Sequence, residues 1–156
     1  MRKRSKYRSK GVRLDAMAYV QESMTPVAEC TNVLVTMRLK NHAAMTELTQ
    51  GRAVKGDLTV LISAVNMTEA LCRRGFGDEY NDVIKDGLAA LRAVGGRGLL
   101  SGKYILKAAE MRALNEAMQL HDAQLDIITI KDMENALADI YEEIRNKRAT
   151  PIKEIA

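Results

Sequence analysis

The chain has 156 residues, 47% of them hydrophobic and 28% charged, which is the composition of one globular domain rather than of a disordered protein. Its longest apolar run, 58–65, is interrupted by Thr59 and Ser63 and is far shorter than the about 20 residues that span a bilayer. We therefore expect neither a second full-sized domain nor a membrane-spanning segment, and we expect no membrane partner.

The lack of a secretory signal pattern and the use of cysteine predict a cytoplasmic protein. The basic start of the chain is not followed by a continuous apolar segment and a small-residue cleavage site, as a secretory signal would be. The two cysteines, Cys30 and Cys72, form no CxxC pair, so we expect reduced thiols that fill apolar space rather than a disulfide.

The net charge of +4 is unevenly distributed along the chain. Residues 1–13 carry seven basic side chains and no acidic one, which leaves 14–156 with a charge of about −3. Such a segment neutralises phosphates, and an aromatic ring within it stacks on bases. The candidate nucleic-acid-binding residues here are Arg2, Lys3, Arg4, Lys6, Tyr7, Arg8, Lys10 and Arg13. A solubilising leader, or a segment that contacts protein, is the alternative.

The N-terminal third predicts helices over 15–23 and 41–49, with a helix also over the Val- and Thr-rich segment 31–37. No proline occurs between Pro26 and Pro151, so nothing there breaks a long helix. We expect the methionines of this third to fill the core, with an adaptable partner surface as the alternative; they are Met17, Met24, Met37 and Met45.

Two amphipathic helices follow. The first begins with Asp57 as its cap and stops at Gly75, with apolar residues recurring at steps of three and four. The second runs over 78–94 and is expected to end at the glycine pair 95–96.

The last part of the chain predicts two more helices. Residues 99–128 lack proline and are apolar over more than one face, so we predict that this helix is the central one. Thr129 and Asp132 predict the start of a final helix that ends in basic residues and carries Met133, Leu137, Ile140 and Ile144. The expected fold is an all-α, single-domain bundle of five or six helices over 14–150, between a basic flexible tail, 1–13, and a C-terminal tail, 151–156.

The glycine-rich segment 95–103 lacks the spacing of a phosphate-binding loop. A Walker loop requires glycine where Arg97 stands and a hydroxyl where Tyr104 stands, and the dinucleotide pattern fails at Ser101. We therefore predict a flexible interhelical hinge and no nucleotide cofactor.

His121 and Asp122 form the adjacent pair found in metal-dependent phosphohydrolases of the HD type. His42 and either Asp126 or Asp139 would complete that order of ligands. The chain has two histidines in all, and His121 shares a helical stripe with apolar residues, which favours a core histidine. We predict no metal site, no cofactor and no catalytic residue.

Residues 41–74 have the outline of a helix-turn-helix. Arg52 and Lys55 lie near the start of its second helix and are candidate nucleic-acid contacts. The turn of about seven residues exceeds the usual three to four, and we expect two packed core helices instead.

Several segments resemble small, uncharacterised helical accessory proteins encoded by proteobacterial phages and prophages. The resemblance runs along most of the chain and rests on Lys6-Tyr7-Arg8, Lys10-Gly11-Val12-Arg13-Leu14-Asp15, Leu48-Thr49-Gln50-Gly51-Arg52-Ala53, Asn66 to Leu71, Leu114-Asn115-Glu116-Ala117 and Leu120-His121-Asp122-Ala123-Gln124. It implies a protein in the host cytoplasm that works by binding a host component.

The expected function is therefore that of a non-enzymatic phage or prophage accessory protein, which binds and modulates a host protein of defence or regulation; whether it forms a homo-oligomer is left open. The alternative is a nucleic-acid-binding protein that uses the basic segment 1–13 and the helix-turn-helix-like segment.

Overall fold

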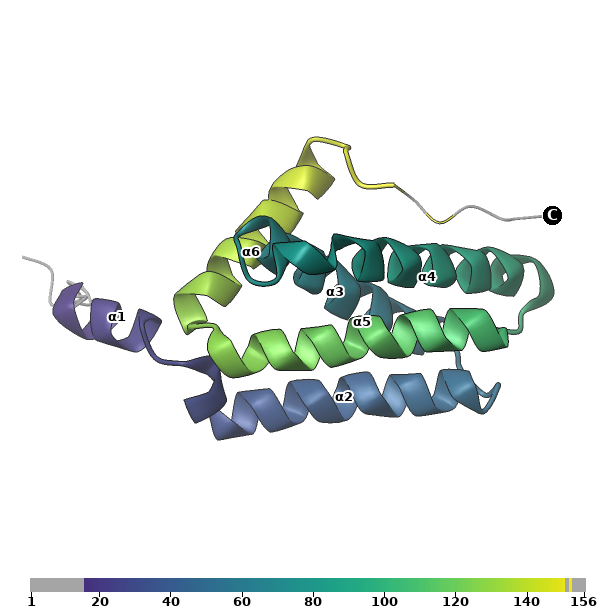
Figure 1. The fold of residues 1–156 in the computed structure, drawn as a ribbon, viewed down its shortest axis with the longest axis horizontal. Helices are drawn as coiled ribbons and strands as arrows, with labels where there is room; N and C mark the ends of the chain where they lie inside the picture. Colours follow the sequence, from purple (N-terminus) through teal and green to yellow (C-terminus); the bar gives the residue numbers. More distant parts are fainter. Residues whose placement is uncertain (1–15, 151, 153–156) are drawn as a thin grey trace, which may run out of the picture.

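The computed structural model describes residues 16–150 and residue 152. Within these residues it has six α-helices and no strand, which confirms the predicted all-α bundle (Figure 1). The helices are α1 (Ala16–Ser23), α2 (Thr31–Thr49), α3 (Lys55–Arg73), α4 (Asn81–Ser101), α5 (Ala108–Ile127) and α6 (Ile130–Arg145). Two short 3-10 turns, η1 (Val27–Glu29) and η2 (Asp78–Tyr80), precede α2 and α4.

Helix α2 is one continuous helix, so the low-periodicity segment 31–37 is helical as predicted and joins the helix expected over 41–49. Threonine hydroxyls of α2 donate hydrogen bonds to backbone carbonyls of the same helix. Thr36 donates to the Asn32 carbonyl at 2.7 Å and Thr46 to the His42 carbonyl at 2.8 Å. These bonds to the preceding turn let β-branched threonines occupy a helix that their intrinsic preference does not favour.

The central helix is α3, not the helix predicted over 99–128. Helix α3 packs against α2, α4, α5 and α6, and nine of its 19 residues are buried, against six of the 20 in α5. Figure 1 shows α2, α4 and α5 running alongside one another, with α6 crossing at one end and α1 projecting beyond it. The helix over 99–128 was predicted to be central because it is apolar over more than one face, but an apolar side chain on a second face can remain exposed to solvent. Ile127 of α5, for example, is 66% exposed.

The glycines of α4 pack against neighbouring helices and do not end the helix. Helix α4 continues through Gly95 and Gly98 and ends at Gly102, whose φ of 71° is left-handed. A Cβ at Gly98 would overlap the ring of Tyr104, and one at Gly87 would lie 2.7 Å from the Cβ of Ala117. The predicted stop at 95–96 and the predicted hinge over 95–101 are therefore wrong, because Gly95 and Gly98 lie inside a helix where a small residue is required; Gly102 and Lys103 do lie in the connection between α4 and α5.

Carboxylates in the first turns define where three helices begin. Asp57 accepts from the Val54 amide at 2.8 Å, so it lies in the first turn of α3 rather than at the cap position. Glu110 does the same for the Lys107 amide at 2.8 Å, which starts α5 nine residues later than predicted. Thr129 accepts from the Asp132 amide, which confirms the predicted start of α6.

Two hydrophobic clusters share α3. The larger joins α2, α3, α4 and α5, and the smaller joins η1, α2, α3 and α5 to Ala136 of α6. The chain before α2 is fastened to the α5–α6 connection through the backbone: the Val27 amide donates to the Ile128 carbonyl and the Ile130 amide to the Thr25 carbonyl, both at 2.9 Å. Helix α6 therefore covers one end of the bundle.

Candidate functional site

The candidate ligands of the phosphohydrolase pattern lie close together only in part. His42 Nε2 lies 2.8 Å from Asp122 Oδ2, and Arg38 binds Asp126 at 2.7 Å and lies 3.6 Å from Asp122. An arginine therefore sits where a metal would have to bind these carboxylates, and the cluster ties α2 to α5. Over 16–150, no three acidic, histidine or cysteine side chains are arranged to hold a metal ion.

The fourth candidate ligand, Asp139, lies on α6, where it binds Arg74 of α3 with two hydrogen bonds of 2.7 and 2.8 Å. Arg73 pairs likewise with Glu143 at 2.7 Å. The hydrogen bond from Arg74 is the main cause of the lowered pKa of Asp139. These pairs fasten one flank of α6 to α3.

His121 is a core histidine, as predicted, with 1% of its surface exposed. Its Nδ1 lies 3.0 Å from Thr68 Oγ1 on α3. One turn further along α5, the Gln124 amide donates to the carbonyls of Thr68 and Phe76 at 3.2 and 2.8 Å. Burial lowers the pKa of His121 to about 4, although the Asp122 carboxylate acts in the opposite direction, so the ring is neutral at pH 7.

The candidate nucleic-acid residues in the described part of the chain are Arg52 and Lys55. Arg52 is bound to Glu47 by two hydrogen bonds of 3.0 and 2.9 Å, which raise the pKa of the guanidinium and neutralise its charge locally. Lys55 is exposed at the first position of α3. The remaining candidates lie outside the described residues; they are Arg2, Lys3, Arg4, Lys6, Tyr7, Arg8, Lys10 and Arg13.

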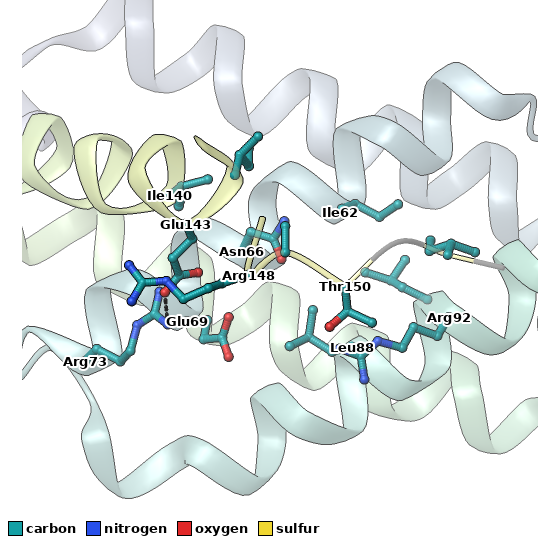
Figure 2. Close-up of a pocket in the computed structure, with 14 residues that line it drawn as sticks. Ile62, Asn66, Glu69, Arg73, Leu88, Arg92, Ile140, Glu143, Arg148 and Thr150 are labelled. Carbon is teal, nitrogen blue, oxygen red and sulfur yellow. Dashed lines mark hydrogen bonds and ion pairs between the residues drawn. The ribbon is translucent and has the colours of Figure 1, made fainter. Parts of the chain in front are cut away.

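A cavity of about 380 Å³ lies between α3, α4, α6 and residues 148–150 and 152. Figure 2 shows its charged rim, in which Arg73 meets Glu143 while Arg92 projects from α4 on the other side. In the part of the chain that the structure describes, Arg92 and Arg148 form no ion pair. Three arginines and two glutamates leave this rim with one net positive charge over a floor of aliphatic side chains.

A second, more apolar cavity of about 390 Å³ is a groove between α2 and α6, with α3 as its floor. We call it the α2–α6 groove. Thr59 and Ser63 on its floor donate to the Lys55 and Thr59 carbonyls of their own helix at 3.0 and 2.9 Å, so they present mainly carbon. The groove is lined by Met37, Lys40, Asn41, Thr59, Val60, Ser63, Ala64, Met67, His121, Met133 and Leu137.

Apolar side chains of α6 continue outward from this groove. Ala136 is the one buried residue of α6, whereas Leu137, Tyr141 and Ile144 are 36%, 68% and 56% exposed. Ala136 packs in the smaller core cluster and the ion pairs of Asp139 and Glu143 join the adjacent flank to α3, so that only part of the apolar stripe faces the core. The stripe was visible in the sequence, but its exposure depends on this packing.

The methionines of the N-terminal third divide between core and surface. Met45 is buried and Met37 is half-buried in the groove, but Met17 and Met24 are 65% and 61% exposed. The prediction that these residues fill the core is therefore wrong for Met17 and Met24. Among the described residues α1 packs mainly against α6, and most of its residues are exposed.

Comparison of the chain with models of protein families, with curated proteins and with solved structures finds no match. No helix among the described residues is both long enough and apolar enough to cross a bilayer.

Proposed function

We propose that this chain is a non-enzymatic protein that acts by binding another protein, and that the α2–α6 groove receives the apolar face of a partner helix. The observation that carries the proposal is the exposed apolar stripe of α6, in which Leu137 forms a wall of the groove and Tyr141 follows one turn later. Exposed apolar surface beside a concave apolar site is typical of protein interaction sites.

A helix fits the shape and chemistry of the groove. Two helices form its walls and a third forms its floor, which is the arrangement into which a further helix of a bundle packs. Lys40 on its rim is exposed and forms no ion pair with any described residue. We therefore expect an acidic side chain beside the apolar face of the partner helix.

The resemblance to phage and prophage accessory proteins makes a host protein the expected partner, with modulation of that protein as the outcome. The competing function is nucleic-acid binding through the seven basic residues of 1–13. Nuclease treatment separates the two, because only contacts that pass through nucleic acid depend on it.

The test is capture of partners from a proteobacterial lysate by the tagged full chain, with and without nuclease, identified by mass spectrometry. Leu137→Lys places a charge on the groove wall, and Leu100→Lys makes the same change at a 52% exposed position of α4, away from the groove. Matching thermal unfolding of the three proteins shows that each is folded.

We expect wild type and Leu100→Lys to retain one protein in near-stoichiometric amount under both conditions, and Leu137→Lys to retain at least tenfold less. Equal capture by both variants would contradict binding at the groove. Capture that disappears with nuclease would favour the nucleic-acid function instead.

A further inference from the structure

The hydrogen bonds of Thr68 fix the tautomer of His121. The Thr68 hydroxyl donates to the Ala64 carbonyl one turn earlier in α3, at 3.0 Å. Its only proton is thereby used, so at the 3.0 Å contact with His121 it accepts, and Nδ1 of the ring carries the proton. Nε2 of the neutral ring is left with a lone pair and is a hydrogen-bond acceptor.

That acceptor has no partner in the described residues. Nε2 is buried and makes no hydrogen bond, and the His121 side chain lines the α2–α6 groove. A buried acceptor without a partner is costly, whereas a bound donor removes the cost. Access requires only that neighbouring side chains shift, and three of the side chains lining the groove are flexible methionines, Met37, Met67 and Met133.

A second polar side chain lines the same groove. The Asn41 side chain on α2 is 7% exposed and makes no hydrogen bond to another described residue. The groove therefore combines an imidazole acceptor with an amide that both donates and accepts, in a lining that is otherwise mainly carbon. A few polar groups within apolar walls are what orients a bound aromatic group in a protein pocket.

We propose that the partner of the α2–α6 groove is anchored there by a tyrosine side chain, whose hydroxyl donates to Nε2 of His121 and accepts from the amide of Asn41. A phenolic hydroxyl matches both groups because it is donor and acceptor at once, whereas an indole N–H only donates. Tyrosine is also enriched among the residues that dominate binding energy at interfaces. The inference rests on the proposed function, since it names the side chain that this groove binds.

Side-chain analogues test the anchor without a known partner. The probes are para-cresol, which is the tyrosine side chain, and two molecules that lack the donor, toluene and para-methylanisole. Binding to the full chain is measured by titration followed with nitrogen NMR of the histidine rings. We expect para-cresol to bind about tenfold more tightly than either control and to shift the Nε2 resonance of His121.

Two variants assign the preference to named atoms. Asn41→Leu removes the amide and should reduce the preference for para-cresol. Thr68→Val removes the acceptor that holds the proton on Nδ1, so the ring can carry the proton on Nε2 instead. Nε2 would then donate to an ether oxygen, and the affinity for para-methylanisole relative to para-cresol should be higher in this variant than in wild type. His121→Phe should abolish the preference, and the other two variants keep the test decisive if this one does not fold.

The outcomes separate the anchor from the proposed function. Equal affinities for the three probes overturn the anchor, even when capture from lysate still depends on Leu137. A para-cresol preference without any captured protein upholds the hydroxyl site and overturns the protein-binding function. A wild-type dimer that para-cresol dissociates would place a tyrosine of a second copy in the groove and overturn a separate partner.

Discussion

The two sides of α3 are packed in different ways. Beside the cavity of about 380 Å³, α3, α4 and α5 approach one another closely at glycines of α4: a Cβ at Gly95 would lie 3.1 Å from Leu58 of α3, and one at Gly87 would lie 2.7 Å from the Cβ of Ala117 of α5. On the side towards α2 and α6, α3 is left with a groove of about 390 Å³, whose lining includes the unpartnered Nε2 of His121. We expect the closed side to stabilise the fold and propose that the open side binds, so changes on the two sides should affect different properties.

The largest loss of stability is expected on the closed side, from Gly98→Val. The new side chain would overlap the Tyr104 ring, and overpacking of this kind costs about 3 kcal/mol. Urea unfolding measures the change. Gly56→Ala is the matched control, because a Cβ there meets only Val54 Cγ2 at 4.0 Å, and we expect it to be neutral or slightly stabilising. Wild-type stability of Gly98→Val would refute the close packing.

Protonation of His121 should weaken the fold where the closed and open sides meet. Its pKa is about 4 in the folded chain and about 6.5 when exposed, so the unfolded state takes up the proton first as the pH falls. The stabilising contribution is complete above pH 6.5 and is lost as the pH falls towards 4, by about 3 kcal/mol.

Urea unfolding at several pH values measures this loss, and His121→Phe removes the titrating group. The variant should therefore lose less stability than wild type between neutral pH and pH 4. An identical pH dependence in the two proteins would show that His121 is not shielded from water.

A smaller effect is expected at Glu110, which joins the start of α5 to α4. Arg97 donates two hydrogen bonds to it, at 2.8 and 2.6 Å, and the Lys107 amide a third. Burial by itself would raise the pKa of Glu110, but hydrogen bonds from Arg97 and Lys107 outweigh it and hold that pKa below its usual value. Glu110→Gln should cost about 2 kcal/mol in urea unfolding at pH 7, and less as the pH falls through the lowered pKa, where the wild-type carboxylate is itself protonated.

The smallest effect on stability is expected on the open side, from Asp139→Asn. About a third of each side chain in the pair with Arg74 is exposed (34% and 37%), so its loss should cost less than about 1 kcal/mol. Because the pair helps to set the rotation of α6, the same variant should nevertheless weaken capture of the partner. Unchanged capture would show that the remaining contacts of α6 hold its stripe in place.

Much of the helical pattern was predictable because its causes are local. The pairing of Thr129 with Asp132 lies within one turn, and it marked the start of α6 correctly. Gly95 and Gly98 led to a wrong prediction of the helix end, because the residues that leave no room for a Cβ there lie elsewhere in the chain. They are Ile152 and Leu58 at Gly95, and Tyr104 at Gly98. Nothing in the local pattern distinguishes a glycine that ends a helix from one that admits a neighbour.

The candidate site shows the same division more sharply. The sequence identified His121 as a core histidine and α6 as amphipathic, since both follow from helical spacing. The tautomer of His121 depends on Thr68, 53 positions away, and the rotation of α6 depends on Arg73 and Arg74.

By itself, then, the sequence determined the all-α class, most of the helices and the absence of a recognisable catalytic motif, because periodicity and capping act within a few residues. Only the tertiary structure decided which helix is central, which apolar faces stay uncovered and where the α2–α6 groove opens. Those properties depend on how helices distant in the chain fit against one another, and the fit is set by single side chains such as the absent Cβ of Gly98 and the carboxylate of Asp139.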